Sequence, residues 1–324
     1  MQNGNWSMDS VPSQEGRVVI ITGGNSGIGY EAAKALAAKN AQVVLAVRDQ
    51  AKGALAKQEI LLQHPLAAID VMRLDLASLA SIRQFAQEFQ SRYDRLDVLI
   101  NNAGVMALPR RLTTDGFEMQ FGTNHLGHFA LTGLLIDTLL ATPASRAVTV
   151  SSMLHMSGKI RFDDLMGEKS YDKQAAYSQS KLANLLFAYE LQRKLAGIPA
   201  DTISLGAHPG YAATNLQYAG PEMEGSKASR LMMQLANSLF AQSAEMSALP
   251  ILYAALSPDI SGGEYAGPSA LMGARGYPIK AESSPASHDL ETAARLWQVS
   301  KELTGVDYAV LETDKQVETL PHVS

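Results

Sequence analysis

The sequence contains no cysteine among its 324 residues. Disulfides, zinc–thiolate centres and thiol nucleophiles are therefore excluded, and the chain is compatible with a reducing compartment. Positive charge is also scarce, because 27 Lys and Arg residues face 32 Asp and Glu residues, for a net charge of −5. This balance gives no support to a nucleic-acid partner or to binding at an anionic membrane surface.

Long apolar runs are the second absence. No stretch approaches the roughly 18 apolar residues of a membrane-spanning helix, and the polar first 16 residues contain no apolar core of signal-peptide length. The most apolar stretch, near residues 131–141, is interrupted by threonine, glycine and aspartate, and we predict a buried helix there. We therefore expect a soluble, cytoplasmic protein without a membrane anchor.

Short β-branched runs alternate with helical patterns along the whole chain. Seven runs are predicted as strands, at residues 17–24, 41–49, 67–75, 96–104, 146–152, 200–210 and 262–268. Such alternation indicates a parallel sheet built from right-handed crossovers, and uniformly apolar strands indicate helices on both faces. The fold class predicted is α/β: a single-domain Rossmann fold with a doubly wound parallel sheet of about seven strands.

The predicted organisation is a flexible polar segment at 1–16, one catalytic domain at 17–310 and a tail at 311–324. Two segments depart from the alternation, the polar residues 153–174 and the Met-, Ala-, Gly- and Ser-rich residues 211–245. Both follow the carboxyl end of a strand, where open α/β sheets bind their ligands. Because methionine adapts to varied apolar ligands, we interpret 211–245 as a substrate lid, although an amphipathic helix is the alternative.

A glycine-rich turn, "TGGNSGIG" at residues 22–29, joins the first predicted strand to the first helix. Glycines let backbone N–H groups approach a pyrophosphate, and the helix N-terminus adds unpaired donors and a positive dipole end. A tight turn is the simpler alternative, but the position after the first strand favours nucleotide binding. The candidate cofactor-binding residues of this turn are Gly23, Asn25, Ser26, Gly27, Ile28 and Gly29.

Two strand ends further along the chain bear on which nucleotide binds. Arg48 lies nineteen residues after Gly29, where an arginine favours the 2′-phosphate of NADP over the 2′-hydroxyl of NAD. A surface arginine is the alternative, and the adjacent Asp49 weakens the inference. Asp75, followed by Leu76, can accept a hydrogen bond from adenine or cap the next helix, a function that Ser78 could share.

Tyr177 and Lys181 are four residues apart in a predicted helix and therefore share a face. A nearby ammonium favours the phenolate and is expected to lower the tyrosine pKa, so that the phenol can exchange a proton with a carbonyl or an alcohol. The spacing alone also occurs by chance. Ser151 and Ser152 end the fifth strand, where a hydroxyl could hold a carbonyl. The fourth strand ends in "NNAG", whose small groups, Asn102, Ala103 and Gly104, can lie along a flat cofactor.

In combination, "TGGNSGIG", "NNAG", "GTNHLGHF", "VSS" and "YSQSK" resemble the short-chain dehydrogenase/reductase family, in the family's order and over about residues 17–310. The resemblance implies that Tyr177 is the catalytic acid/base and that Lys181 lowers its pKa and holds the nicotinamide ribose. It implies that Ser152, twenty-five positions before Tyr177, orients the carbonyl and that Asn124 supports a water-linked proton path. The "HPG" loop implies further cofactor contacts at Pro209, Gly210, Ala212 and Thr214.

Within the family the chain resembles the retinol-dehydrogenase and protochlorophyllide-reductase-like branch, through "AVRD", "TNHLGHF" and "SKLANLLFAYEL" among others. Retinol dehydrogenases usually carry an N-terminal membrane anchor; we expect none here, and we therefore expect a soluble NADP(H)-dependent carbonyl reductase or alcohol dehydrogenase. A C=C reductase and a non-catalytic NADPH sensor are the alternatives. The light-dependent relatives use a pocket cysteine, which is absent here.

The remaining expectations concern single residues and partners. His125 and His128 are interpreted as packing or surface groups, because no histidine–carboxylate grouping has metal-site spacing. His155 could touch the substrate, and Trp297 is predicted to anchor the core. The expected partner is a small, apolar carbonyl or alcohol, with NAD(H) a weaker cofactor candidate than NADP(H), no metal, and a homo-oligomer left open.

Overall fold

An eight-stranded sheet forms the centre of the computed structural model, which describes residues 5–211 and 242–312. The strand order is β3-β2-β1-β4-β5-β6-β7-β8; all neighbours are parallel except the last pair, which is antiparallel. The strands are β1 (Val18–Thr22), β2 (Gln42–Val47), β3 (Ile69–Arg73), β4 (Val98–Asn101), β5 (Arg146–Val150), β6 (Ile203–Ala207), β7 (Tyr265–Ala270) and β8 (Arg275–Ala281). The doubly wound parallel sheet is thereby confirmed, with one strand more than expected.

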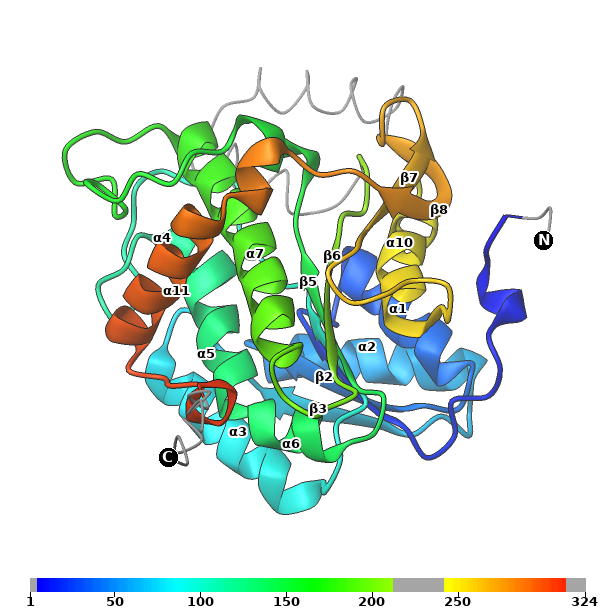
Figure 1. Ribbon diagram of the computed structural model, residues 1–324. Helices are drawn as coiled ribbons and strands as arrows, with labels where there is room; N and C mark the ends of the chain where they lie inside the picture. The colour runs from blue at the N-terminus through cyan, green and yellow to red at the C-terminus, as the bar shows by residue number, and fades with distance from the viewer. Residues whose placement is uncertain (1–4, 212–241, 313–324) are drawn as a thin grey trace, which may run out of the picture.

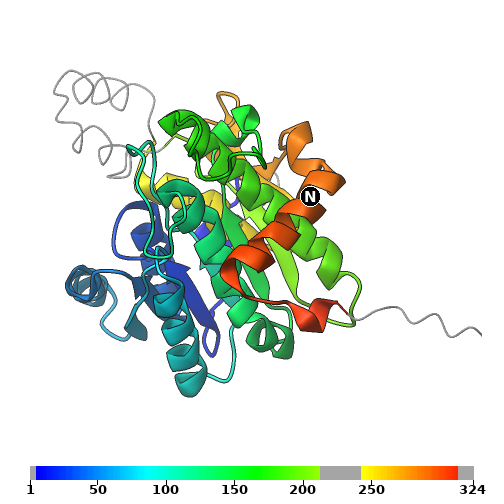
Figure 2. The ribbon, with the colours of Figure 1, turned by 90° about the vertical axis from the view of Figure 1, so that its left-hand side faces the viewer.

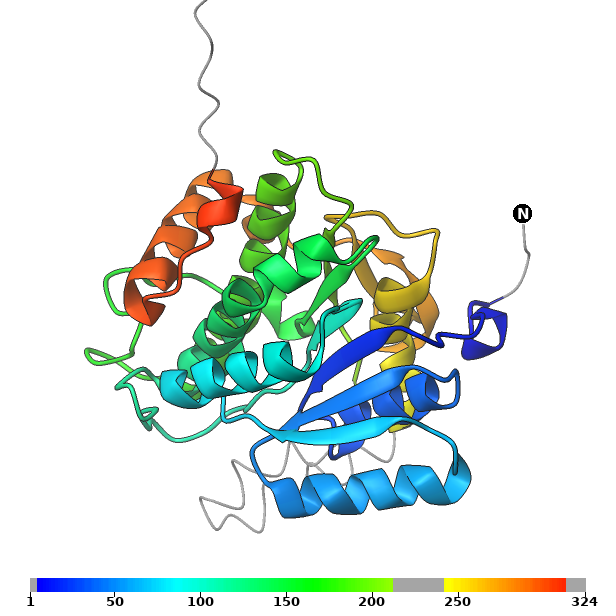
Figure 3. The ribbon, with the colours of Figure 1, turned by 90° about the horizontal axis from the view of Figure 1, so that it is seen from below.

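Helices cover both faces of this sheet (Figures 1 and 3). Alternate residues of one strand enter different cores, because side chains along a strand point to opposite faces: Val18 and Ile20 join one cluster, Val19 and Ile21 the other. The helices packed on the second cluster are α1 (Gly27–Ala37), α2 (Gln50–Gln63) and α10 (Ala244–Leu256). Those on the first are α3 (Leu79–Arg92), α5 (Gly127–Leu134) and α7 (Lys173–Leu195), with α11 (Leu290–Thr304) outside α7 (Figure 2).

The remaining helical elements are short. They are α4 (Met119–Phe121), a π turn (Gly122–Leu126), α6 (Ile136–Ala141) and 3-10 turns at Met8–Ser10, Met153–Ser157, Pro285–His288 and Ala309–Leu311. Trp297 of α11 is buried against Phe129, Phe187 and Tyr308, so its predicted place in the core is confirmed. No helix in the two described ranges is both long enough and apolar enough to cross a bilayer.

Side-chain caps start several helices where short polar residues follow a strand. Asp49 accepts the backbone N–H of Lys52 at the start of α2, and Ser78 accepts that of Ser81 at the start of α3. Asp172 accepts the N–H groups of two α7 residues, which fixes the first turn of the helix that carries Tyr177. Most of the predicted lid, residues 212–241, lies outside the described residues.

Candidate active site

Four predicted residues meet where the carboxyl ends of β4 and β5 face the first turns of α7. Tyr177 and Lys181 lie on α7, Ser152 follows β5, and Asn124 lies in the π turn before α5. Tyr177 is 4% exposed and Lys181 3%, so both titratable groups are withdrawn from water. The Lys181 ammonium lies 5.6 Å from the centre of the Tyr177 ring.

Burial controls the protonation of this pair. It raises the pKa of Tyr177 to about 12, opposed only by a side-chain hydrogen bond with Ser152. It also lowers the pKa of Lys181 from 10.5 to about 8. Desolvation disfavours the charged form of each group, and Lys181 is not among the causes of the tyrosine shift, so the expectation that Lys181 lowers the tyrosine pKa stays a prediction. At neutral pH the site presents a phenol and an ammonium.

The end of β5 separates two adjacent serines. The Ser151 hydroxyl is buried and donates to the carbonyl of Lys181 at 2.7 Å. Ser152 is half-buried, and its hydroxyl bonds with Tyr177 and accepts the N–H of Leu154 at 3.3 Å. Ser151 thus ties α7 to the sheet, whereas Ser152 is the serine beside the phenol.

Lys181 and Asn184 both bind the last carbonyl of β5. The ammonium of Lys181 donates to the Val150 oxygen at 3.2 Å and the amide of Asn184 donates to it at 3.0 Å. The side chain of Lys181 is therefore held at the carboxyl edge of the sheet.

Asn124 is held by the loop that follows β4. Its side-chain oxygen accepts the N–H of Val105 at 2.8 Å, and its amide donates to the Val105 carbonyl and to Ser180, each at 2.9 Å. A Cβ on Gly104 would lie 3.1 Å from the Asn124 oxygen and 3.6 Å from the Lys181 ammonium. Asn124 and Lys181 thus border the same glycine. Ser180, one residue before Lys181, carried no separate sequence signal.

The glycine turn leaves no space for a side chain at Gly29. A Cβ on Gly29 would come within 2.5 Å of the Gly23 carbonyl and 2.6 Å of the Asn102 amide, so α1 packs on the strand ends as predicted. Gly23 and Gly27 have φ of +68° and +56°, which favours glycine. The side chain of Ser26 does not cap α1, so it leaves the first-turn donors to another acceptor. This cradle fits a pyrophosphate. Asn25 and Ile28, also predicted contacts, are half-buried within it.

Thr22 joins the glycine turn to the "NNAG" loop. Its buried hydroxyl accepts the N–H groups of Asn102 and Ala103, each at 2.9 Å, and its carbonyl accepts the Asn102 amide at 2.9 Å. Thr22 belongs to the quoted motif but was missed as a site residue, because a threonine that ends a strand is ordinary in sequence.

The two strand-end groups expected to select the nucleotide have different partners. Arg48 is exposed directly after β2, whereas Asp49 caps α2, so the competing carboxylate is engaged. Asp75 accepts the N–H of Ala77 at 3.0 Å, beside the buried Leu76. Since Ser78 caps α3, Asp75 stabilises the turn before that helix instead of capping it.

The loop after β6 is tied to the β7–β8 hairpin. Gly210 has a φ of +75°, and a Cβ there would come within 2.4 Å of the Ala274 carbonyl. The carbonyl of Pro209 accepts a hydrogen bond from Gln242 at 2.9 Å. The predicted cofactor contacts Ala212 and Thr214 lie outside the described residues.

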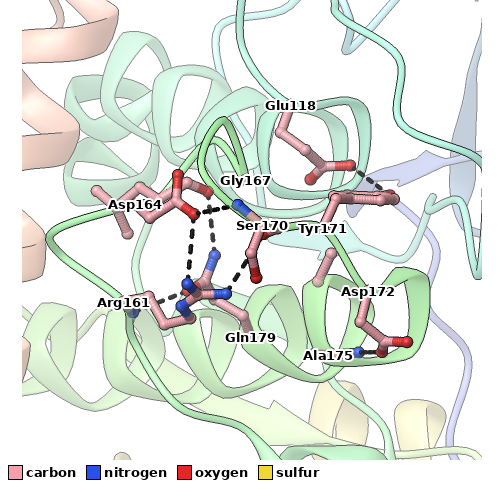
Figure 4. A pocket seen from close by; sticks show the side chains of 11 residues that line it. Glu118, Arg161, Asp164, Gly167, Ser170, Tyr171, Asp172, Ala175 and Gln179 are labelled. Atoms are coloured by element: carbon pink, nitrogen blue, oxygen red, sulfur yellow. Dashed lines mark hydrogen bonds and ion pairs between the residues drawn. The ribbon is translucent and has the colours of Figure 1, made fainter.

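The 153–174 segment, here named the insert, encloses a pocket whose polar groups bind one another (Figure 4). Glu118 accepts the N–H groups of Gln120 and Phe121 and the Tyr171 hydroxyl at 3.1 Å, and burial raises its pKa. Asp164 accepts three N–H groups of its own loop. The lining includes the first turns of α7 but none of the four reactive residues. The hydrogen bonds around this pocket therefore hold the insert against the start of α7.

The histidines near the site are internal. His155 is buried, with Nδ1 2.7 Å from the Ser152 carbonyl and Nε2 accepting the N–H of Ser284 at 3.0 Å. Both ring nitrogens are used within the protein, so the expectation that His155 touches the substrate is wrong. His125 and His128 are each 1% exposed, as the packing interpretation predicts.

Comparisons with known proteins identify the family of this chain. The short chain dehydrogenase family model matches residues 17–224. Human retinol dehydrogenase 13 (Homo sapiens) is 41% identical over 298 residues, which cover 90% of this chain and 86% of that protein. Polyprenol dehydrogenase from Danio rerio is 38% identical over 311 residues, covering 94% and 91%.

A solved structure of an uncharacterised protein from Mycobacterium paratuberculosis superposes with a TM-score of 0.79 at 41% identity, covering 94% of this chain and 99% of that one. The sequence relatives are named as dehydrogenases, which makes this chain an oxidoreductase by descent. The chain belongs to the short-chain dehydrogenase/reductase family, in its retinol-dehydrogenase-like branch.

Proposed function

We propose that the protein is an NADP(H)-dependent oxidoreductase that interconverts a carbonyl compound and its alcohol. The observation that carries the proposal is that Tyr177 has a hydrogen bond with the Ser152 hydroxyl and has the Lys181 ammonium 5.6 Å from its ring centre, at the carboxyl edge of the sheet. A buried phenol with a hydroxyl and a cation nearby suits proton exchange with a substrate oxygen.

When bound, the nicotinamide would supply a hydride to the carbonyl carbon or accept one from the alcohol carbon. Ser152 orients the substrate oxygen by a hydrogen bond, and Tyr177 donates the phenolic proton to it. Lys181, an ammonium at neutral pH, holds a ribose hydroxyl, and Asn124 supports the path that returns a proton to the phenol. Because burial raises the pKa of Tyr177 to about 12, the resting phenol is a donor, which suits carbonyl reduction.

The cofactor would lie along the glycine turn and the "NNAG" loop. Gly23, Gly27 and Gly29 admit the pyrophosphate, and exposed Arg48 meets the 2′-phosphate. Asp75 and Leu76 border the adenine, and Pro209 and Gly210 the nicotinamide. Arg48 supports NADP(H) over NAD(H), because Asp49 is committed to capping α2.

The substrate we propose is an apolar small-molecule carbonyl or alcohol, with no limit set on its chain length. The names of the relatives make retinoids and polyprenols the first compounds to examine. Soluble aldehydes, ketones and secondary alcohols complete the set, because the reactive residues recognise only the oxygen and leave the remaining skeleton to other contacts.

The test is a substrate panel followed at the NADPH absorbance, with Tyr177→Phe and Tyr189→Phe compared. Tyr189 is on the same helix and its hydroxyl binds Ser283, so its variant controls for loss of a phenol from α7. Tyr177→Phe should lose at least about a thousandfold in kcat while NADPH binds nearly as before. Near-normal turnover by Tyr177→Phe would refute the assignment, and NADPH binding by the parent without any turnover would favour a sensor.

A further inference from the structure

His128 connects two parts of the active site that lie far apart in the sequence. It follows Asn124 by one helical turn and is 1% exposed. Its Nδ1 lies 2.9 Å from the backbone carbonyl of Asn124, and its Nε2 lies 2.9 Å from the Thr22 hydroxyl. One imidazole thus bridges the π turn and the end of β1.

The direction of these bonds follows from counting protons. The Thr22 hydroxyl has one proton and two lone pairs, and the N–H groups of Asn102 and Ala103 occupy the lone pairs. Its proton points to His128 Nε2, which at 2.9 Å is closer than the Ile100 carbonyl at 3.4 Å. Nε2 is then the acceptor, so the ring proton sits on Nδ1 and is donated to the Asn124 carbonyl.

The ring is held neutral in this position. The pKa of His128 is lowered to about 4, chiefly by burial; the bond to the Asn124 carbonyl opposes this shift, and the charge of Lys181 contributes to it. A neutral ring has one donor and one acceptor nitrogen, which matches the two partners.

Asn124 is consequently fixed at both ends. Its side chain binds Val105 and Ser180, and its main chain binds His128. Through Thr22, the same histidine braces the backbone of the loop that we assign to the cofactor. Displacement of a reacting group by about 1 Å can cost a hundredfold in rate. Loss of the hydrogen bonds that hold Asn124 and the loop in place is therefore expected to lower the rate.

His125 provides the contrast on the same segment. It is equally buried, its Nε2 lies 2.8 Å from Ser300 of α11, and its ring packs against Phe121 and Phe129. None of these partners is Asn124 or a residue of the glycine turn.

We propose that His128 is a positioning residue: as the Nδ1–H tautomer it locks the Asn124 carbonyl and, through the Thr22 hydroxyl, the "NNAG" loop. The proposal rests on the proposed function for its kinetic consequence, whereas the tautomer and the brace on the loop stand independently. His128 touches neither substrate nor cofactor in this scheme.

The first experiment reads the tautomer by 15N-histidine NMR of the full chain, with the His128 signal assigned from its loss in His128→Asn. We expect a neutral ring with its proton on Nδ1, unchanged between pH 6 and pH 8. A proton on Nε2, or a ring that titrates in that range, would overturn the proposal without any measurement of turnover.

The second experiment separates the two bonds. Asparagine places its amide donor near the Nδ1 position, and glutamine places an acceptor near Nε2. His128→Gln should lower kcat on the order of tenfold with NADPH affinity retained, because the Asn124 brace is lost. His128→Asn should weaken NADPH binding, measured directly by titration, on the order of tenfold with kcat at saturation retained. His125→Phe should change neither quantity.

Each result of these experiments either supports or overturns the positioning role of His128. If His128→Phe, which lacks both bonds, matches His125→Phe in kcat and in NADPH affinity, the brace is absent. If His128→Phe does not fold, the asparagine and glutamine variants carry the test, because each keeps one bond. A parent protein that binds NADPH but reduces no carbonyl would remove the proposed function, yet the NADPH titration and the NMR spectrum would still judge His128.

Discussion

The cofactor side and the reactive side of the site are built from different materials. Residues 22–29 contribute glycines, one threonine and backbone groups, and none of their side chains titrates between pH 4 and pH 10. The reactive side includes two buried titratable groups, Tyr177 and Lys181, and the buried His125 and His128 lie close to Asn124 in the chain; burial shifts the pKa of all four. The cofactor side depends on glycines, which have no side chains, and the reactive side depends on the exclusion of water from titratable groups. Steric changes should therefore damage the cofactor side, and pH changes should damage the reactive side.

The largest effect should follow from adding a methyl group to the cofactor side. In Gly29→Ala the new Cβ would meet the Gly23 carbonyl at 2.5 Å and the Asn102 amide at 2.6 Å, so the strand end or α1 must move. We expect destabilisation of about 1–3 kcal/mol and a loss of NADPH affinity of at least roughly a hundredfold, since the pyrophosphate cradle is displaced. Thermal melting and NADPH titration measure the two quantities.

Gly197→Ala is the matched control, because its Cβ would have the Lys194 carbonyl at 3.2 Å as its nearest neighbour. That variant should bind NADPH as the parent does. Unchanged NADPH affinity in Gly29→Ala would show that the turn does not form the cradle.

Lowering the pH should first destabilise the buried histidines close to Asn124. Burial lowers the pKa of His125 to about 3 and that of His128 to about 4. The unfolded state therefore binds more protons below pH 6.5, so stability is complete above that pH and falls as the pH drops toward 4. His125→Phe should reduce the loss of unfolding free energy between pH 7 and pH 4 by about 3 kcal/mol in urea titrations.

Above pH 6.5 this histidine contributes no slope, so the parent and His125→Phe curves should run parallel there. Identical losses between pH 7 and pH 4 in the two proteins would contradict a buried neutral ring at position 125.

The difference between the sides also explains what the sequence could predict. The glycine turn, the strand alternation and the cap at Ser78 are local signals, and the structure has them where the sequence placed them. β8 was missed because "RGYPIKA" combines glycine, proline and charge on an exposed edge strand, without an apolar alternation. An edge strand buries too little to leave a clear pattern.

Contacts between segments that are distant in the sequence could not be predicted from residue spacing. The raised pKa of Tyr177 depends on burial that a four-residue interval cannot report. One of the two partners of His128 comes from 106 positions away at Thr22, and one of the two partners of His155 from 129 positions away at Ser284. A histidine in a helical pattern is interpreted as a packing residue whether or not it positions a reactive group. Only the fold shows that His128 and His125 have different partners.

The smallest effect should come from the rim of the cofactor side, where Arg48 is exposed and water competes for its charge. Arg48→Ala should raise KM for NADPH about tenfold, the cost of one charge-assisted hydrogen bond, and leave KM for NADH unchanged. Lys52→Ala, which removes a neighbouring exposed cation paired with Asp49 at 3.9 Å, should alter neither KM.

Asp49→Ala should cost about 1 kcal/mol of stability through the lost cap of α2, without a change of nucleotide preference. If Asp49→Ala instead weakened NADH binding while Arg48→Ala left NADPH unaffected, the carboxylate would be the group that reads the ribose, and the cofactor assignment would pass to NAD(H).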